Sequence, residues 1–193
     1  MADEDDKHCM ARLREGDELA LNDLMARWQE PLITFCLRYT GNLTDARELA
    51  QETFVKVYQS RDRFHPKEGA AFSTWIFRIA TNLCRMRHRW KERHPEVLNV
   101  NRDSLCATED LIEATEGNPR DDLERKTLAA DLDAAIRELP PDQRTAFILQ
   151  EMQGKTQSEI AAIQNCSVKA VERRLSRART FLRDLLQKRW SPS

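Results

Sequence analysis

The chain has 193 residues, 40% of them hydrophobic and 33% charged, with a formal net charge of −1. No apolar run is long enough to cross a bilayer, and the acidic start MADEDDKHC is followed by no apolar segment of the kind found in signal peptides. Five cysteines without a C-x-x-C pair do not indicate a disulfide framework or a zinc site. We therefore expect a cytoplasmic protein with no membrane insertion, no metal and no cofactor.

Apolar residues recur at helical spacing through the first ninety residues, and no strand-like alternation interrupts them. We expect Asp17 to cap the first helix, Pro31 to kink or split it, and Ser73 to cap the third. Three amphipathic helices can bury their stripes against one another and form one small core. The stripes comprise Leu21, Leu24, Met25, Trp28, Leu32 and Phe35, then Ala46, Leu49, Ala50, Phe54 and Val57, then Ile76, Ile79, Ala80 and Leu83.

Charge is segregated along the chain despite the balanced total. Residues 85–93 hold five Arg or Lys, residues 96–124 hold nine acids, and residues 169–189 hold eight Arg or Lys. Two basic blocks separated by an acidic one suggest polyanion-binding surfaces joined by an acidic connector. Charge alone does not separate this interpretation from helix faces that are merely solvated.

The helical periodicity fades between residues 93 and 126, where prolines, Gly117 and the acids indicate a linker that is extended or partly helical. A second helical domain is expected from near Leu128. Within it, Thr156 can cap a short helix at 157–164, and the turn 165–167 leads to a long basic helix. This pattern fits a helix-turn-helix, whose second helix enters the major groove. An ordinary helical hairpin with an arginine-rich surface is the alternative.

Three segments resemble bacterial sigma factors. LPPDQRTAFILQEMQGKTQSEIAAIQNCSVKAVERRLSRARTFLRDLL resembles region four, which recognises the minus-thirty-five promoter element. TDARELAQETFVKVYQS resembles the region-two helix that docks on polymerase, and FSTWIFRIATNLCRMRHR resembles the segment that melts and reads the minus-ten element. Their order and spacing are similar to those of the extracytoplasmic-function group. The resemblance implies an all-α protein with a region-two domain at 1–92, an acidic linker at 93–126 and a region-four domain at 127–193.

The resemblance also implies three sets of site residues. The polymerase-binding set is Asp45, Glu48, Gln51 and Glu52. The downstream set is Phe64, Lys67, Phe72, Asn82, Arg85, Arg87, Arg89 and Lys91. The upstream set is Ser167, Lys169, Ala170, Glu172, Arg173, Arg174, Ser176 and Arg177. The polar residues of the first set suit a partner surface, although a solvated face is the alternative. In the downstream set, the loop Phe64–Phe72 would surround an extruded base, with Phe72, Trp75 and Trp90 as candidate stacking surfaces. Phe72 and Trp75 are also plausible core residues, and Trp75 is the better suited of the two to the core.

The implied function is that of a non-enzymatic sigma factor that directs polymerase to promoters and assists their opening. Its expected partners are core RNA polymerase, promoter DNA and an anti-sigma factor, and the free chain should be a monomer. Met86, Lys169, Ala170 and Glu172 depart from the usual family pattern, which leaves the promoter sequence open. The main alternative is a free-standing helix-turn-helix regulator that binds DNA as a dimer. The melting segment argues against that alternative, and no catalytic motif indicates an enzyme.

Overall fold

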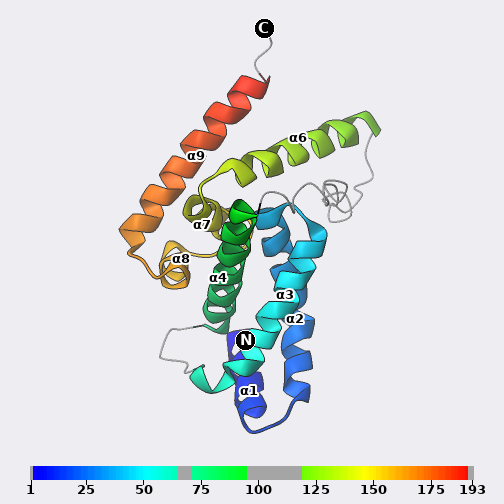
Figure 1. The fold of residues 1–193 in the computed structure, drawn as a ribbon, viewed down its shortest axis with the longest axis vertical. Helices are drawn as coiled ribbons and strands as arrows, with labels where there is room; N and C mark the ends of the chain where they lie inside the picture. The colour runs from blue at the N-terminus through cyan, green and yellow to red at the C-terminus, as the bar shows by residue number, and fades with distance from the viewer. Residues whose placement is uncertain (1, 65–70, 95–118, 191–193) are drawn as a thin grey trace.

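The computed structural model describes residues 2–64, 71–94 and 119–190, with side chains for 3–64, 71–94 and 127–188. Over these residues the regular secondary structure is helical, as the sequence predicts (Figure 1). The elements are α1 (Ala2–Arg14), α2 (Leu19–Thr40), α3 (Leu43–Gln59), the 3-10 helix η1 (Arg61–Arg63), α4 (Phe72–Arg93), α6 (Pro119–Glu138), α7 (Pro141–Glu151), α8 (Gln157–Gln164) and α9 (Val168–Trp190).

Helices α2, α3 and α4 pack against one another through the three predicted stripes. The turn between α2 and α3 depends on Gly41, which has a φ of 72° and whose N–H donates to Leu37 O. A Cβ at this position would also collide with the side chain of Arg137 from α6. Asn42 then begins α3, because its side chain accepts a hydrogen bond from the Asp45 N–H at 2.9 Å. The positive φ therefore favours glycine here, and a larger residue would in addition have to displace the Arg137 side chain.

Two local expectations differ from the structure: the split at Pro31, which was one of the two outcomes expected there, and the cap at Ser73. Helix α2 is not split at Pro31, because Leu32 and Phe35 just beyond it are fully buried and their packing offsets the hydrogen bond that proline cannot donate. Ser73 does not cap α4. The first N–H of that helix, from Phe72, instead donates to Asp3 Oδ1 at 2.9 Å. Asp17 does act at the start of α2, where its Oδ1 accepts the Leu19 N–H at 3.1 Å.

Helix α1 was not among the predicted elements, although it belongs to the first core. Its few apolar residues include Met10 and Leu13, both buried. Asp6 is also buried, and accepts a hydrogen bond from Trp28 Nε1 at 3.1 Å while pairing with Arg27. Acids in the first turn and arginines in the last are the signal that could have revealed this helix, since both complement the helix dipole.

The second helical group begins with α6, whose first residue, Pro119, lies inside the segment expected to be linker. The helix-turn-helix elements are confirmed. Thr156 and Glu159 form a reciprocal capping box at the start of α8, in which Glu159 Oε2 accepts the Thr156 N–H at 2.8 Å. Asn165 ends α8 in the left-handed conformation with a φ of 51°, and α9 begins after the turn.

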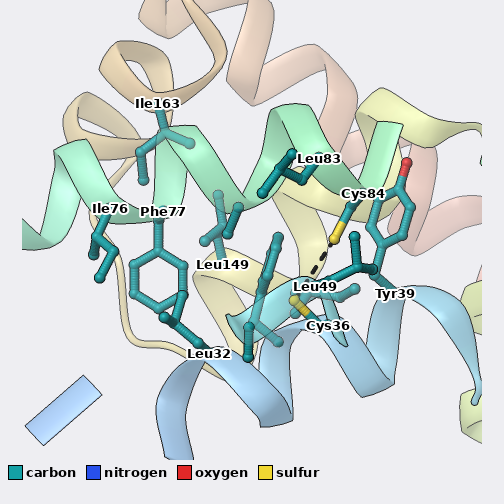
Figure 2. Close-up of a cluster of buried hydrophobic side chains, with 14 of the residues drawn as sticks. Leu32, Cys36, Tyr39, Leu49, Ile76, Phe77, Leu83, Cys84, Leu149 and Ile163 are labelled. Atoms are coloured by element: carbon teal, nitrogen blue, oxygen red, sulfur yellow. Dashed lines mark hydrogen bonds between the residues drawn. The ribbon is translucent and has the colours of Figure 1, made fainter. Parts of the chain in front are cut away.

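The two helical groups share one continuous core. Figure 2 shows Leu149 of α7 and Ile163 of α8 beside Phe77 and Leu83 of α4. Helix α4 lies directly against α8, and α2 lies against both α6 and α7. Two domains that meet only through a linker would not bury this surface, so the sequence patterns alone did not anticipate the contact.

Candidate nucleic-acid interface

The start of α9 presents most of the predicted upstream set to solvent. Ser167, Lys169, Glu172, Arg173, Ser176 and Arg177 are exposed, and Ala170 is half-buried. Ser167 Oγ accepts the Ala170 N–H at 3.2 Å and so caps the helix. Lys169, Arg173 and Arg177 follow one another at four-residue intervals and share one face. In the part of the chain that the structure describes, the ion pairs of α9 involve Arg174 and Arg179 and none of these three side chains. All three cations are therefore available to an external anion.

Arg174 differs from the rest of the upstream set because it points inward. Its Nη1 donates to Gln164 Oε1 at 2.5 Å and to Cys166 Sγ at 3.1 Å, and its Nη2 donates to Asp142 Oδ2 at 2.7 Å. Arg174 therefore ties α9 to α7, to α8 and to the turn between α8 and α9. In this arrangement it orients the reading helix rather than presenting its own guanidinium.

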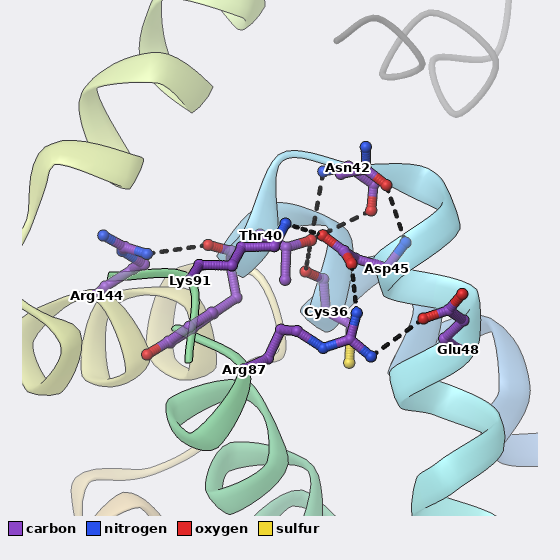
Figure 3. A network of polar contacts seen from close by, with 9 residues as sticks. Cys36, Thr40, Asn42, Asp45, Glu48, Arg87, Lys91 and Arg144 are labelled. Carbon is purple, nitrogen blue, oxygen red and sulfur yellow. Dashed lines mark hydrogen bonds and ion pairs between the residues drawn. The ribbon is translucent and has the colours of Figure 1, made fainter. Parts of the chain in front are cut away.

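The predicted DNA-binding residues at the basic end of α4 also divide into exposed side chains and side chains with internal partners. Asn82 and Arg89 are exposed, whereas Arg85, Arg87 and Lys91 are half-buried. Arg87 donates to Asp45 Oδ1 at 2.6 Å and to Glu48 Oε2 at 3.0 Å (Figure 3). Burial alone would lower the pKa of the Arg87 guanidinium, but these two carboxylates raise the pKa above its ordinary value.

Asp45 connects the predicted polymerase-binding and DNA-binding sets. It was expected on an exposed face, but it is only 8% exposed and accepts from both Arg87 and Lys91 of α4. That expectation is wrong because two cations from a neighbouring helix converge on the first turn of α3 (Figure 3). The other three predicted polymerase-binding residues, Glu48, Gln51 and Glu52, are exposed.

An apolar groove adjoins the polymerase-binding set and was missed by the sequence analysis. It runs between α2 and α3 and includes Leu19 and Val55, which are 69% and 51% exposed. Gln51 and Tyr58 lie on its α3 side. The available signal was Val55 itself, an apolar residue among polar ones on the outer face of α3. Exposed apolar side chains beside polar ones are typical of a protein-binding surface.

The aromatic residues next to the predicted base-reading loop are mostly buried. Phe64 and Phe72 are 4% and 0% exposed, and Trp75 packs on Phe64 with ring centroids 5.0 Å apart. Of the two places that the sequence left open for Phe72, the structure puts it in the core and not on a stacking surface, and Trp75 is partly in the core as expected. Trp90 is 41% exposed and stacks on His94 at 4.7 Å. Lys67, with the loop residues 65–70, lies outside the described residues.

The described residues form neither a cluster of metal ligands nor a helix that could span a membrane. Among them no three His, Cys, Asp or Glu side chains come together in a way that could hold a metal ion. Across the same residues no helix is both long and apolar enough to span a bilayer.

Comparison with known proteins adds to this geometry. Residues 24–94 match the sigma-70 region 2 family and residues 129–182 match sigma-70 region 4. The chain is 31% identical to the ECF RNA polymerase sigma-E factor of Haemophilus influenzae over 94% of this chain and 95% of that protein. The structure resembles CnrH bound to the cytosolic domain of CnrY, with a TM-score of 0.66, 27% identity and coverage of 95% and 98% of the two chains. It also resembles the sigma factor RpoE of Bartonella quintana bound to the anti-sigma factor NepR, with a TM-score of 0.62, 25% identity and coverage of 86% and 96%.

Proposed function

Since the chain belongs to the extracytoplasmic-function group of RNA polymerase sigma factors, we propose how its helices divide the work of starting transcription. As a sigma factor it directs RNA polymerase to promoters and so initiates transcription. The family consists of non-catalytic initiation factors, and we assign this chain no enzymatic step of its own. Its place of action is accordingly the cytoplasm, where polymerase and DNA are.

Helix α9 reads the upstream element. Lys169, Arg173 and Arg177 lie on one exposed face at the start of a helix that follows a tight turn. An α-helix fits the major groove, where an arginine can bind a guanine edge with two hydrogen bonds and discriminate by about 1–3 kcal/mol. Glu172 on the same turn can accept from a cytosine amino group, which would give this chain a promoter preference of its own.

Helix α4 contacts the downstream element. Asn82, Arg89 and Trp90 are exposed along its outer side, so that an amide, a cation and an aromatic face are available to opened DNA. The cations hold phosphates and supply affinity, while stacking on an aromatic ring contributes about 1–3 kcal/mol per base. Buried Phe64 and Phe72 anchor the two ends of the loop Phe64–Phe72, which is proposed to surround the extruded base.

The outer face of α3 binds polymerase. Glu48, Gln51 and Glu52 are exposed beside the apolar groove that contains Leu19 and Val55. A polar rim beside an apolar centre is the arrangement that stable protein interfaces use. Asp45 supports this surface indirectly, because its ion pairs with Arg87 and Lys91 hold α4 against α3.

An anti-sigma factor regulates the chain, and the free chain is a monomer. The support for the first statement is that the similar RpoE structure is a complex with the anti-sigma factor NepR. The exposed apolar groove between α2 and α3 and the basic face of α9 are the surfaces that such a protein would cover.

The exposed cationic face of α9 is the observation that carries the assignment, and run-off transcription tests it. Purified core polymerase with the chain should transcribe a subset of a promoter library, and Arg173→Ala should weaken one promoter class more than the others. Arg183→Ala is the matched control, because Arg183 is also exposed on α9 but lies ten residues further along. If neither variant changes transcription from any promoter, the face does not meet DNA.

A further inference from the structure

A single carboxylate joins the two predicted DNA-binding sets. Asp142 lies in the first turn of α7, between α4 and α9. Its Oδ1 forms an ion pair with Arg85 Nη2 of α4 at 2.8 Å. Its Oδ2 accepts a hydrogen bond from Arg174 Nη2 of α9 at 2.7 Å. One internal acid thus neutralises one cation from the downstream set and one from the upstream set.

The contact between Arg85 and Asp142 lies in a groove along the outer side of α4. Asn82, Arg85 and Arg89 line it from α4, and Pro141 and Asp142 line it from α7. The first turn of α7 therefore borders the stretch of α4 that would hold phosphates and contacts it at Arg85. Arg85 is only partly satisfied in this position: its Nη2 forms the ion pair with Asp142 without meeting the geometry of a hydrogen bond, and its Nε has no hydrogen-bond partner among the described residues. A guanidinium in this state retains the capacity to bind a better-placed acceptor.

Other contacts hold the same arrangement at some distance from Asp142. Lys155 Nζ, next to the start of α8, donates to Ser73 Oγ of α4 at 2.8 Å and lies 5.7 Å from the ring centre of Phe77. On the other side of the interface, buried Arg144 of α7 donates to the Tyr39 carbonyl of α2 at 3.1 Å and lies over the Tyr39 ring. We call the arrangement in which the two helical groups pack together the closed arrangement. It is held by these contacts and by the shared core, and not by the Asp142 ion pair alone.

A promoter cannot be read in this arrangement. Elements centred near minus ten and minus thirty-five are separated by roughly 25 base pairs, which is about 85 Å of duplex at about 3.4 Å per base pair. In this structure α4 and α8 are packed directly against each other (Figure 1). Helix α8 in turn packs against α9, so the two reading helices α4 and α9 are held too close together to cover both elements of a straight duplex. The two helical groups must therefore separate first.

We propose that the free chain inhibits its own DNA binding through this contact, an inference that rests on the proposed function. The Asp142 carboxylate occupies the place of a DNA phosphate on Arg85, since both present anionic oxygens to a guanidinium. Because Asp142 is part of the same chain, DNA must compete with an acceptor of high effective concentration. The closed state therefore lowers the affinity of the free chain for duplex DNA whatever its sequence, and promoter binding begins with the loss of the Arg85–Asp142 pair.

Asp142→Asn tests this inference, because it removes the charge with almost no change of shape. Glu151→Gln is the matched control: Glu151 lies at the other end of α7 and pairs with Arg179 of α9 at 2.7 Å. The probe is a fluorescent 30-base-pair duplex of random sequence, titrated with the free full-length chain at several NaCl concentrations. Asp142→Asn should bind about five- to tenfold more tightly at low salt, with a log–log salt slope steeper by about one because one more phosphate is neutralised. Glu151→Gln should stay within about twofold, with an unchanged slope.

Ser73→Ala weakens the closed state at its other end without changing any charge. It removes the acceptor for Lys155 and touches none of the predicted DNA-binding residues. Combined with Asp142→Asn, it should enlarge the radius of gyration measured by X-ray scattering, while circular dichroism shows that the helices persist. A folded Asp142→Asn chain that binds the duplex no more tightly than Glu151→Gln overturns the inference, and so does a folded double variant as compact as the unaltered chain. Failure of the unaltered chain and Glu151→Gln to support transcription with core polymerase would instead refute the proposed function.

Discussion

Replacing Asp45 with asparagine should destabilise the protein while leaving its polymerase-binding surface in place. The Asp45 carboxylate is buried and accepts from Arg87 at 2.6 Å and from Lys91, both on α4. The substitution keeps the shape of the side chain and removes the charge that draws these two cations onto α3. Its effect therefore separates a residue that holds α3 and α4 together from one that meets polymerase directly.

The expected size of this effect follows from burial. Losing one partner of a fully buried ion pair costs about 3–5 kcal/mol, whereas exposed pairs contribute about 0–1 kcal/mol. The side chains of Arg87 and Lys91 are 26% and 29% exposed, so water recovers part of their hydration when they are released. We expect a loss of about 2 kcal/mol in the free energy of unfolding. At about 2–4 °C per kcal/mol for a chain of this size, Tm should fall by about 4–8 °C.

Thermal unfolding followed by circular dichroism measures the change, with Glu52→Gln as the control. Glu52→Gln removes the same charge from the same helix, but Glu52 is exposed. The Tm of this variant should therefore differ from that of the unaltered chain by about 2 °C or less. A double-mutant cycle with Arg87→Gln separates the ion pair from the favourable position of Asp45 at the start of α3. Equal Tm values for Asp45→Asn and Glu52→Gln, or no coupling energy in the cycle, would refute this reasoning.

Three further predictions concern other parts of the molecule. Glu48→Arg combined with Gln51→Ala should abolish binding to core polymerase in a pull-down without loss of helicity; retained binding would contradict the docking assignment. Burial and then the charge of Arg144 lower the pKa of His88 below its ordinary 6.5, so protonation favours the unfolded chain. Stability in urea should therefore fall as pH drops below about 6.5, and a His88→Gln chain with the same pH profile would count against this. Burial raises the pKa of the Cys84 thiol, so iodoacetamide should modify it only after unfolding, and rapid modification of the native chain would be the opposing result.

Local signals in the sequence were sufficient for much of this protein. Thr156 and Glu159 are three residues apart, and their capping box begins α8 at the predicted position. The apolar stripes of α2, α3 and α4 needed only the helical period, and their residues are buried in the core or partly buried against it. The exposed face of α9 follows from the same period, because Val171, Leu175 and Ala178 occupy the buried side. Each of these features depends on residues within a few turns of one another.

The tertiary structure decided what depends on residues far apart in the chain. Asp3 caps α4 from 69 positions away, and Lys91 reaches Asp45 across 46, so no local pattern pointed to either contact. The sequence assigned Arg85 and Arg174 to separate DNA-binding sets, but only the packing of α7 against α4 and α9 places Asp142 between them. Helical periodicity shows which face of a helix is buried, whereas the partner that covers it, and the charge this partner brings, is set by how the helices come together in space.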